Sequence, residues 1–243
     1  MDFISGEIIG IDKPLGWTSF DAVKRLRGAI QRRLGLKKFK VGHAGTLDPL
    51  ATGVLVVCTG RATRKIEEIQ SGVKEYVATV KLGATTPSFD LETEIDATFP
   101  TGHITEEAAR EALEGFVGNI MQVPPVFSAV KIDGKRAYKY ARTGKDPELK
   151  PKPVTIKEIE FISLKDNELT FRVVCGKGTY IRALARDLGQ ILNSGAHLIA
   201  LRRTQVGNIR IENCLQVDQA VEKIKTTDLE FPDNYKTISS EED

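Results

Sequence analysis

Apolar and polar residues alternate along several stretches of the chain, and this spacing predicts β-strands. Residues 74–82 alternate, with every second residue from 76 to 82 apolar, which places Tyr76 on the buried face of a strand. Residues 154–164 and 169–175 alternate in the same way and are joined by two turn-favouring polar residues, so they predict a hairpin. Further apolar runs predict strands at 8–11 and 54–58, and a strand pair over 198–211.

Apolar residues recur every three or four positions elsewhere, as in helices that pack on one side. The clearest helix is predicted to begin at Thr18 or Ser19, which can cap its N-terminus, and to run to about Leu34. Its predicted apolar face consists of Phe20, Val23, Leu26, Ile30 and Leu34. Other helices are predicted near 62–69, 105–115, 137–142, 180–192 and 216–224.

The strands and helices interleave irregularly, without the strict alternation that builds a parallel sheet. This order indicates the α+β class, with a mixed, largely antiparallel central sheet flanked by helices. A length of 243 residues, 41% hydrophobic and 28% charged, suits an ordinary globular protein with one large or one two-lobed domain. No apolar run approaches the roughly 20 residues that span a bilayer. The N-terminus also lacks the features of a signal peptide, so we expect no membrane association.

Charge is distributed unevenly along the chain. Residues 226–243 hold six acidic residues and one basic residue and predict a loosely ordered tail, whereas residues 1–225 carry a net charge of +7. Between Asp21 and Asp48 there are eight basic residues and no acidic one. A second basic cluster, at 131–152, is diluted by three acidic residues. Such clusters favour a polyanionic partner, although a solvated helix face is the alternative interpretation.

Cysteine and histidine residues give no sign of a metal site. The three cysteines are far apart and odd in number, so they predict neither a disulfide framework nor a metal knuckle. Cys58 and Cys175 lie in β-like runs and are expected to be buried free thiols, which indicates a reducing, cytoplasmic setting. His103 and His197 have no companion ligand at metal spacing, so we predict no metal.

The strongest candidate for chemistry is a glycine-punctuated segment at 42–53, predicted to be a loop. It holds His43 and Asp48 just after the basic segment and just before an apolar strand. Glycines allow a backbone to approach a ligand closely, and a carboxylate displayed there can act as a nucleophile or a base. An ordinary turn at Asp48-Pro49 is the alternative.

Arg182 is a plausible cation to keep that carboxylate ionised. It lies in the first turn of a predicted helix, after a glycine-containing segment that lacks the spacing of a phosphate-binding P-loop. Arg182 could equally be a surface arginine. Tyr76 is either a core tyrosine or an aromatic that stacks on a nucleobase. His43 is either a general base or a side chain that fills a space in a nucleic-acid stack.

These candidates belong to motifs that resemble those of the tRNA pseudouridine-55 synthase family. The run Leu-Asp-Pro-Leu-Ala-Thr-Gly at 47–53 is specific, and six motifs in the family's order make a chance match negligible. Together they extend along nearly the whole chain. They lie at 12–16, 42–53, 74–76, 124–131 with Gly134 and Tyr138, 178–184 and 201–207.

The resemblance implies a fold, a reaction and a partner. It implies a mixed α+β catalytic domain, here residues 1–225, with an active cleft along the middle of the sheet. The implied reaction converts one uridine in the T-loop of tRNA to pseudouridine, without a cofactor. Because the target atoms are unreachable in a stacked loop, the nucleotide must be flipped out, at a cost of a few kcal/mol. We expect the T-arm of tRNA to be the partner and the enzyme to be a monomer.

The resemblance also implies a role for each candidate residue. Asp48 would be the catalytic aspartate at the ribose, either attacking C1′ or removing the 2′ proton. Arg182 would pair with Asp48, and Tyr76 would stack on the target base near C5. The substrate-binding set would comprise His43 in the space left by the flipped nucleotide, Tyr180 and Leu201 in the uracil pocket, and Lys13 supporting the catalytic loop.

The chain departs from the family pattern in three places. Phe127 stands where many relatives have tyrosine. Residues 85–90 differ from the usual Thr-Asp-Thr pattern, which argues against a role for Asp90. The small C-terminal RNA-binding domain of many bacterial relatives is expected to be missing or reduced.

Three alternatives remain beside the leading hypothesis. They are a pseudouridine synthase acting on another structured RNA, a non-catalytic module that remodels tRNA, and a sugar hydrolase. A pure RNA binder has no use for a carboxylate that repels phosphates, so Asp48 with Arg182 favours catalysis. A sugar hydrolase would need two carboxylates at the bond, and the chain offers one good candidate.

Overall fold

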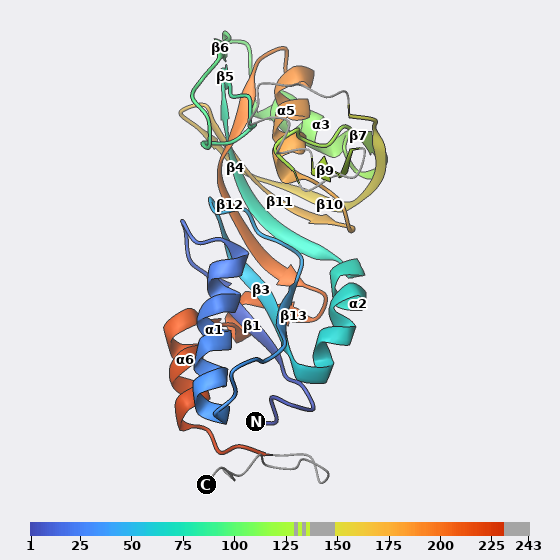
Figure 1. Ribbon diagram of the computed structural model, residues 1–243. Coiled ribbons are helices and arrows are strands. Elements are labelled where there is room, and N and C mark those ends of the chain that lie inside the picture. The colour runs from blue at the N-terminus through green and yellow to red at the C-terminus, as the bar shows by residue number, and fades with distance from the viewer. Residues whose placement is uncertain (129–130, 133–134, 137–148, 231–243) are drawn as a thin grey trace, which may run out of the picture. The chain divides into compact units, whose positions relative to one another are not determined.

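The computed structural model describes residues 1–128, 131–132, 135–136 and 149–230, and these form two compact units (Figure 1). Unit 1 combines Met1–Gln70 with Asn208–Asp243, so it contains both ends of the chain. Unit 2 is the intervening segment, Ser71–Gly207. Both units combine helices with mainly antiparallel strands, which confirms the predicted α+β class.

The sheet of unit 1 is built around β1 (Ile8–Lys13). This strand pairs antiparallel with β3 (Ala51–Thr59) and parallel with the short β14 (Leu215–Gln216), which comes from the far end of the sequence. The other partner of β3 in this unit is β2 (Val41–Ala44), also antiparallel. The predicted strands at 8–11 and 54–58 are therefore confirmed, with longer bounds.

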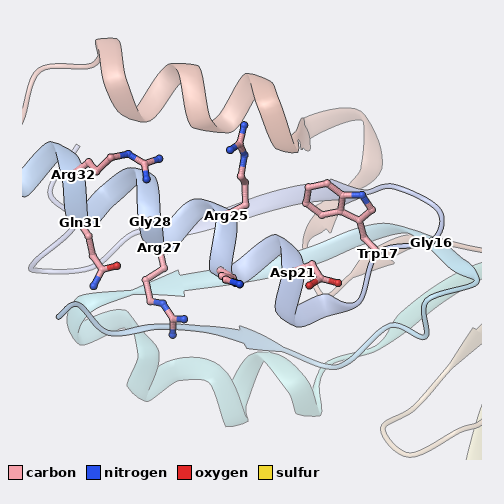
Figure 2. A pocket seen from close by; sticks show the side chains of 9 residues that line it. Gly16, Trp17, Asp21, Arg25, Arg27, Gly28, Gln31 and Arg32 are labelled. Atoms are coloured by element: carbon pink, nitrogen blue, oxygen red, sulfur yellow. The ribbon is translucent and has the colours of Figure 1, made fainter. Parts of the chain in front are cut away.

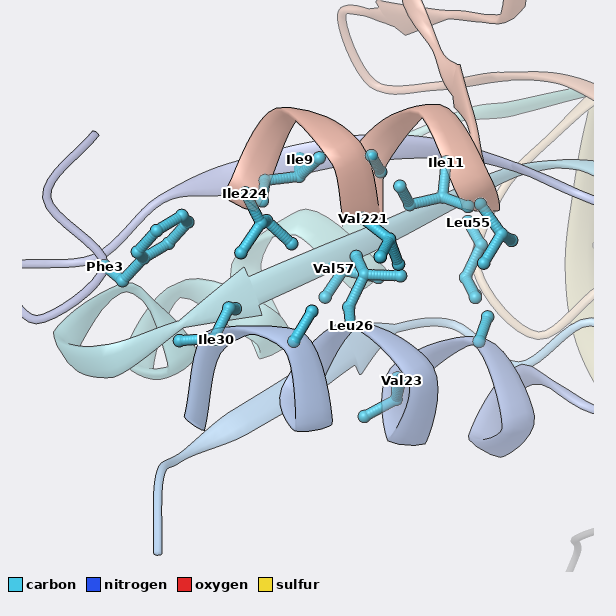
Figure 3. Close-up of a cluster of buried hydrophobic side chains, with 14 residues drawn as sticks. Phe3, Ile9, Ile11, Val23, Leu26, Ile30, Leu55, Val57, Val221 and Ile224 are labelled. Atoms are coloured by element: carbon cyan, nitrogen blue, oxygen red, sulfur yellow. The ribbon is translucent and has the colours of Figure 1, made fainter. Parts of the chain in front are cut away.

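The predicted helix after Thr18 is confirmed as α1 (Ser19–Leu34). Thr18 and Asp21 form a capping box at its N-terminus, and Gly35 ends it with a φ of 67°, a conformation that glycine adopts without strain. The helix packs against α6 (Val217–Thr226), which is the helix predicted at 216–224. Figure 3 shows Leu26 and Ile30 of α1 facing Ile224 and Val221 of α6 over the strands.

One member of the predicted apolar face of α1 is wrong. Phe20 is 57% exposed, because it follows the buried Ser19 by one position and points away from the core. The predicted helix at 62–69 is a 3-10 turn, η1 (Gly60–Lys65), that continues as α2 (Ile66–Ser71). Between β13 (Ile209–Arg210) and β14, unit 1 also contains a second 3-10 turn, η2 (Ile211–Asn213).

The sheet of unit 2 is antiparallel throughout. Its strands follow the order β12 (Ala196–Val206), β4 (Lys74–Leu82), β11 (Glu168–Cys175), β10 (Lys152–Lys165) and β7 (Gly118–Gln122). Alternate residues of β4 are buried, as its sequence pattern predicted. The predicted hairpin is β10–β11, and its turn residues Asp166 and Asn167 have φ values of 52° and 62°, as a type I′ turn requires.

Two helices pack in unit 2 at the places predicted for them. Thr105 caps α3 (Glu106–Glu114), which lies against β10, and α5 (Ile181–Ile191) lies against β12 and β4. Strand β7 was not predicted, because it alternates weakly. Between β4 and α3 lies a small hairpin of β5 (Ala84–Thr85) and β6 (Ala97–Thr98).

Several predictions fall on residues outside the described part of the chain. The short strands β8 (Lys131–Ile132) and β9 (Lys135–Arg136) pair antiparallel. The predicted helix at 137–142, the motif residues Gly134 and Tyr138, and most of the second basic cluster lie outside the described residues. The acidic tail, 226–243, stays a prediction, since only residues 226–230 of it are described.

The cysteines agree with their prediction, since Cys58 and Cys175 are buried free thiols. Burial raises the pKa of the Cys175 thiol to about 11, so it stays protonated at neutral pH. No helix among the described residues is both long and apolar enough to cross a membrane.

Candidate active site

Asp48 lies in unit 1 on the short connection that leads from β2 to β3. This connection is shorter than the predicted loop at 42–53, because residues 42–44 belong to β2 and residues 51–53 to β3. Gly45 opens the turn with a φ of 85°. The backbone oxygen of Asp48 accepts a hydrogen bond from the Ala51 N–H at 3.0 Å, which closes the turn into β3. The Asp48 side chain is half-buried.

Lys13 lies beneath this connection. Its Nζ donates hydrogen bonds to the backbone oxygens of Trp17 at 2.6 Å, Pro14 at 2.9 Å and Pro49 at 3.4 Å. Lys13 is fully buried, so these carbonyls replace the water that would otherwise solvate its charge. The end of β1, the start of α1 and the residue after Asp48 are thereby held together.

Ser19 supports the residue before Asp48, and sequence reasoning assigned it no such part. Its Oγ accepts a hydrogen bond from the Leu47 N–H at 2.8 Å and donates one to the Leu47 oxygen at 3.0 Å. The Gly16 N–H also donates to the Pro49 oxygen at 2.9 Å. Both neighbours of Asp48 are therefore tied to the segment that begins α1. A serine at the start of a helix is normally interpreted as an N-cap, so the sequence offered no sign of its contact with Leu47.

We expect replacement of Lys13 by methionine to lower the free energy of unfolding by about 2–3 kcal/mol. Methionine fills similar space but leaves buried carbonyls without their charged donor. Urea unfolding at unchanged m-value measures the effect, with the exposed Lys38→Met as a matched control that should change stability by no more than about 0.5 kcal/mol. Equal stabilities of the two variants would contradict the bracing contacts.

The structure corrects the position of His43. It lies within β2, opposite Val57 of β3, and not on a loop as predicted. The glycines around it suggested a loop, but Gly42 pairs regularly with Cys58 and continues the strand. The side chain of His43 is half-buried.

Arg182 lies in unit 2, in the first turn of α5, and it is 5% exposed. Its Nη1 donates to the Ser88 oxygen at 3.2 Å and its Nη2 to the Phe127 oxygen at 2.8 Å. Its Nε lies 3.5 Å from Oδ2 of Asp90. The alternative of a surface arginine is therefore wrong. The planar guanidinium is fixed by segments that lie far apart in the sequence.

Asp90 is a buried partner of Arg182, although its departure from the family pattern argued against a role for it. It is 5% exposed, and its Oδ1 accepts a hydrogen bond from the Glu92 N–H at 2.9 Å. Its backbone oxygen accepts hydrogen bonds from Oγ1 of Thr86 at 2.6 Å and from Oγ of Ser88 at 3.2 Å. Thr86, Ser88 and Asp90 are all buried. In the sequence, the spacing of two between these polar residues was the available sign that they face the same way. The comparison with the Thr-Asp-Thr pattern drew attention away from it.

Gln122, at the end of β7, holds the start of α5. Its Oε1 accepts a hydrogen bond from the Tyr180 N–H at 2.9 Å, and its Nε2 donates to the Tyr180 oxygen at 3.2 Å. Gln122 is almost fully buried, whereas Tyr180 is half-buried. Because Arg182 follows Tyr180 by two residues, these bonds also fix the position of the guanidinium. Sequence reasoning missed Gln122 together with its strand.

Tyr76 and Leu201 lie on neighbouring strands of the unit 2 sheet. Tyr76 of β4 is 8% exposed and lies opposite Arg203 of β12. Leu201 lies opposite Ala78, two residues along β4 from Tyr76. Directly opposed residues share a face, so the Tyr76 and Leu201 side chains point to the same side of the sheet. This shared face is what a pocket wall requires and equally what a sheet core requires.

The seven predicted site residues thus form two groups. Unit 1 brings Lys13 to the connection that carries Asp48, with His43 on the preceding strand. Unit 2 holds Arg182, Tyr180, Tyr76 and Leu201 on α5, its N-terminus and two adjacent strands. Within the described ranges, no cluster of three or more His, Cys, Asp or Glu side chains is arranged to hold a metal ion.

Two family models match the chain. The model for the TruB family pseudouridylate synthase N-terminal domain matches residues 31–181. The model for the tRNA pseudouridylate synthase B C-terminal domain matches residues 182–231.

Curated relatives match over nearly their full length. A tRNA pseudouridine synthase B of Phocaeicola vulgatus is 60% identical over 230 residues, which cover 95% of this chain and 98% of the relative. A tRNA pseudouridine synthase B of Bacteroides fragilis is 58% identical over 233 residues, which cover 96% of this chain and 100% of the relative.

Solved structures give the same fold. A chain of a Cbf5–Nop10–Gar1 complex is 31% identical, with a TM-score of 0.68 over 91% of this chain. A chain of an H/ACA RNP bound to a substrate RNA containing 2′-deoxyuridine is 29% identical, with a TM-score of 0.63 over 88% of this chain. The present chain spans about half the length of these solved chains, 55% and 52% respectively.

Proposed function

Because the chain belongs to the TruB family of pseudouridylate synthases, we propose that it converts the uridine at position 55 of tRNA to pseudouridine. The single observation that carries the substrate is the 60% identity, over nearly the whole chain, to a protein named tRNA pseudouridine synthase B. The braced position of Asp48 supports the chemistry, because a catalytic carboxylate must be held in place.

The reaction is an isomerisation in which all atoms of the nucleotide are retained except one exchanged proton. The bond from C1′ of the ribose to N1 of uracil breaks, the base turns, and C1′ bonds to C5 instead. The proton on C5 then leaves, and a proton from solvent ends on N1. We assign to Asp48 the step at the ribose, by attack on C1′ or by removal of the 2′ proton.

Arg182 is proposed to pair with Asp48 as well as with Asp90. A guanidinium has five N–H donors, so it can serve two carboxylates and backbone carbonyls together. The contacts with Ser88, Phe127 and Asp90 support this role, because they hold the guanidinium in one orientation before any substrate binds.

The remaining residues are proposed to receive the flipped nucleotide. Tyr76 would stack on uracil near C5, Tyr180 and Leu201 would line the uracil pocket, and His43 would fill the space left in the T-loop. Lys13 would hold the catalytic connection. We propose that the enzyme acts as a cytoplasmic monomer on the T-arm, since RNA is the one partner that this reaction requires.

The test measures tritium release from tRNA transcripts labelled with [5-³H]uridine. We expect release of one tritium per transcript from the intact tRNA and none from a transcript with cytidine at position 55. Release that persists with cytidine 55 would place the target elsewhere in the tRNA. Release from ribosomal RNA but not from tRNA would favour the alternative of another structured RNA.

A further inference from the structure

Helix α1 carries a basic groove on its exposed side, and we refer to it as the α1 groove (Figure 2). The groove has a volume of about 720 Å³, and its lining includes Lys24, Arg25, Gly28 and Arg32. In Figure 2, Arg25 and Arg32 extend from one edge of the helix and Arg27 from the other, with Gly28 between them. The groove lies entirely within unit 1.

The glycine on the floor of this groove has no structural explanation within the helix. Glycine in a helix interior is less stable than alanine, because it loses more backbone freedom on folding. A Cβ added at Gly28 would meet one atom within 4 Å, Nη1 of Arg32 at 3.4 Å, which is the far end of a flexible side chain. Packing does not demand a glycine here, so its effect is to leave the helix surface open between cations.

The charges around the groove favour an anion. Lys24, Arg25, Arg27 and Arg32 contribute four positive charges. Arg25 lies 3.5 Å from Asp218, but both side chains are largely exposed, so this pair is weak. Asp21, at the N-terminal end of the groove, accepts hydrogen bonds from Thr18 that lower its pKa and keep it ionised. An anion would therefore bind toward Gly28, away from Asp21.

The α1 groove adjoins the connection from β2 to β3 that carries Asp48. Gly16 and Trp17 line its end, the Gly16 N–H bonds to Pro49, and the Trp17 oxygen bonds to Lys13. Gly28 lies nine residues into α1, which corresponds to about 14 Å along the helix axis. An extended polyanion that leaves the target site could therefore follow the helix to Gly28.

We propose that the α1 groove binds phosphate groups of the tRNA backbone outside the flipped nucleotide, with Gly28 admitting a phosphate between the guanidinium groups. This proposal rests on the proposed function, because it takes tRNA as the ligand. Arginine suits this role, because its planar fork can contact two phosphate oxygens. The contact fixes the position of the RNA and carries no sequence information.

The sharpest test is Gly28→Ala, for which stability and RNA affinity should change in opposite directions. We expect the melting temperature to rise by about 2–4 °C, because alanine favours the helix. The Kd for an unmodified tRNA transcript should increase severalfold, because the methyl group occupies the place of the phosphate. An unchanged Kd would overturn the proposal. A decreased Kd would also overturn it.

Arg32→Gln and Arg33→Gln form a matched pair that separates the groove from net charge. Both residues lie in the last turn of α1 and both changes remove one positive charge, but only Arg32 lines the groove. For Arg32→Gln we expect a weaker Kd and a slope of log K against log salt that is shallower by about 1. Arg33→Gln should change neither. Equal effects of the two variants would mean that the net positive charge of the helix, and not the groove, determines RNA affinity. That result would overturn the proposal.

Binding and tritium release are measured separately, so the two proposals can fail independently. Suppose that the wild type binds tRNA and that both Gly28→Ala and Arg32→Gln weaken this binding. The groove proposal is then supported even when no tritium is released. If wild type releases tritium and neither variant changes the Kd, the groove proposal fails alone.

Discussion

Asp48→Asn should lower the rate of pseudouridine formation by at least about 10³-fold. Asparagine has nearly the shape of aspartate, but it can neither attack C1′ nor remove a proton from the ribose. The bonds from Lys13 and Ser19 go to neighbouring backbone atoms, so the connection should keep its conformation. Single-turnover tritium release measures the rate, and filter retention of tRNA measures binding.

Asp166→Asn is the matched control for this substitution. Asp166 is exposed in the β10–β11 turn with a φ of 52°, where asparagine is equally well tolerated. It should release tritium at the wild-type rate. If Asp48→Asn retained a rate within about tenfold of wild type, this carboxylate would not be the catalytic group. If Asp48→Asn bound no tRNA, its effect would lie in binding and the assignment would fail as well.

Arg182→Met should lower the free energy of unfolding by about 3–5 kcal/mol and also abolish activity. The stability loss is large because Asp90 would remain buried without its guanidinium partner, and the oxygens of Ser88 and Phe127 would lose their donors. Urea unfolding with a fitted m-value measures the loss. In contrast, Arg25→Met breaks an exposed pair and should cost less than about 1 kcal/mol.

A double variant tests whether Asp90 is the cause. Adding Asp90→Asn to Arg182→Met removes the uncompensated charge, so part of the lost stability should return. Activity should stay absent, because the guanidinium proposed to pair with Asp48 is still missing. If the double variant is no more stable than Arg182→Met, the pair at 3.5 Å does not explain the loss. If activity returns with stability, Arg182 has only a structural role.

Most elements of the fold were predictable where residues close together in the sequence specify the structure. The alternation of β4, the capped α1 and the β10–β11 turn each depend on residues within one element, and their predictions are confirmed. The weak strand β7 was missed because edge pairing with β10 supplies what its own pattern lacks. His43 was misplaced for a similar reason, since pairing with β3 makes a strand of a glycine-rich segment.

The sequence by itself determined the α+β class, the course of most elements and the motif around Asp48. These features follow from periodicity, from capping residues and from short runs whose members are neighbours in the chain. Only the tertiary structure decided that Asp90 meets Arg182, that Gln122 holds Tyr180, and that Ser19 braces the residue before Asp48. Each of these contacts joins segments brought together by packing. Since a buried charge or amide takes whichever partner the fold presents, no local pattern could name that partner in advance.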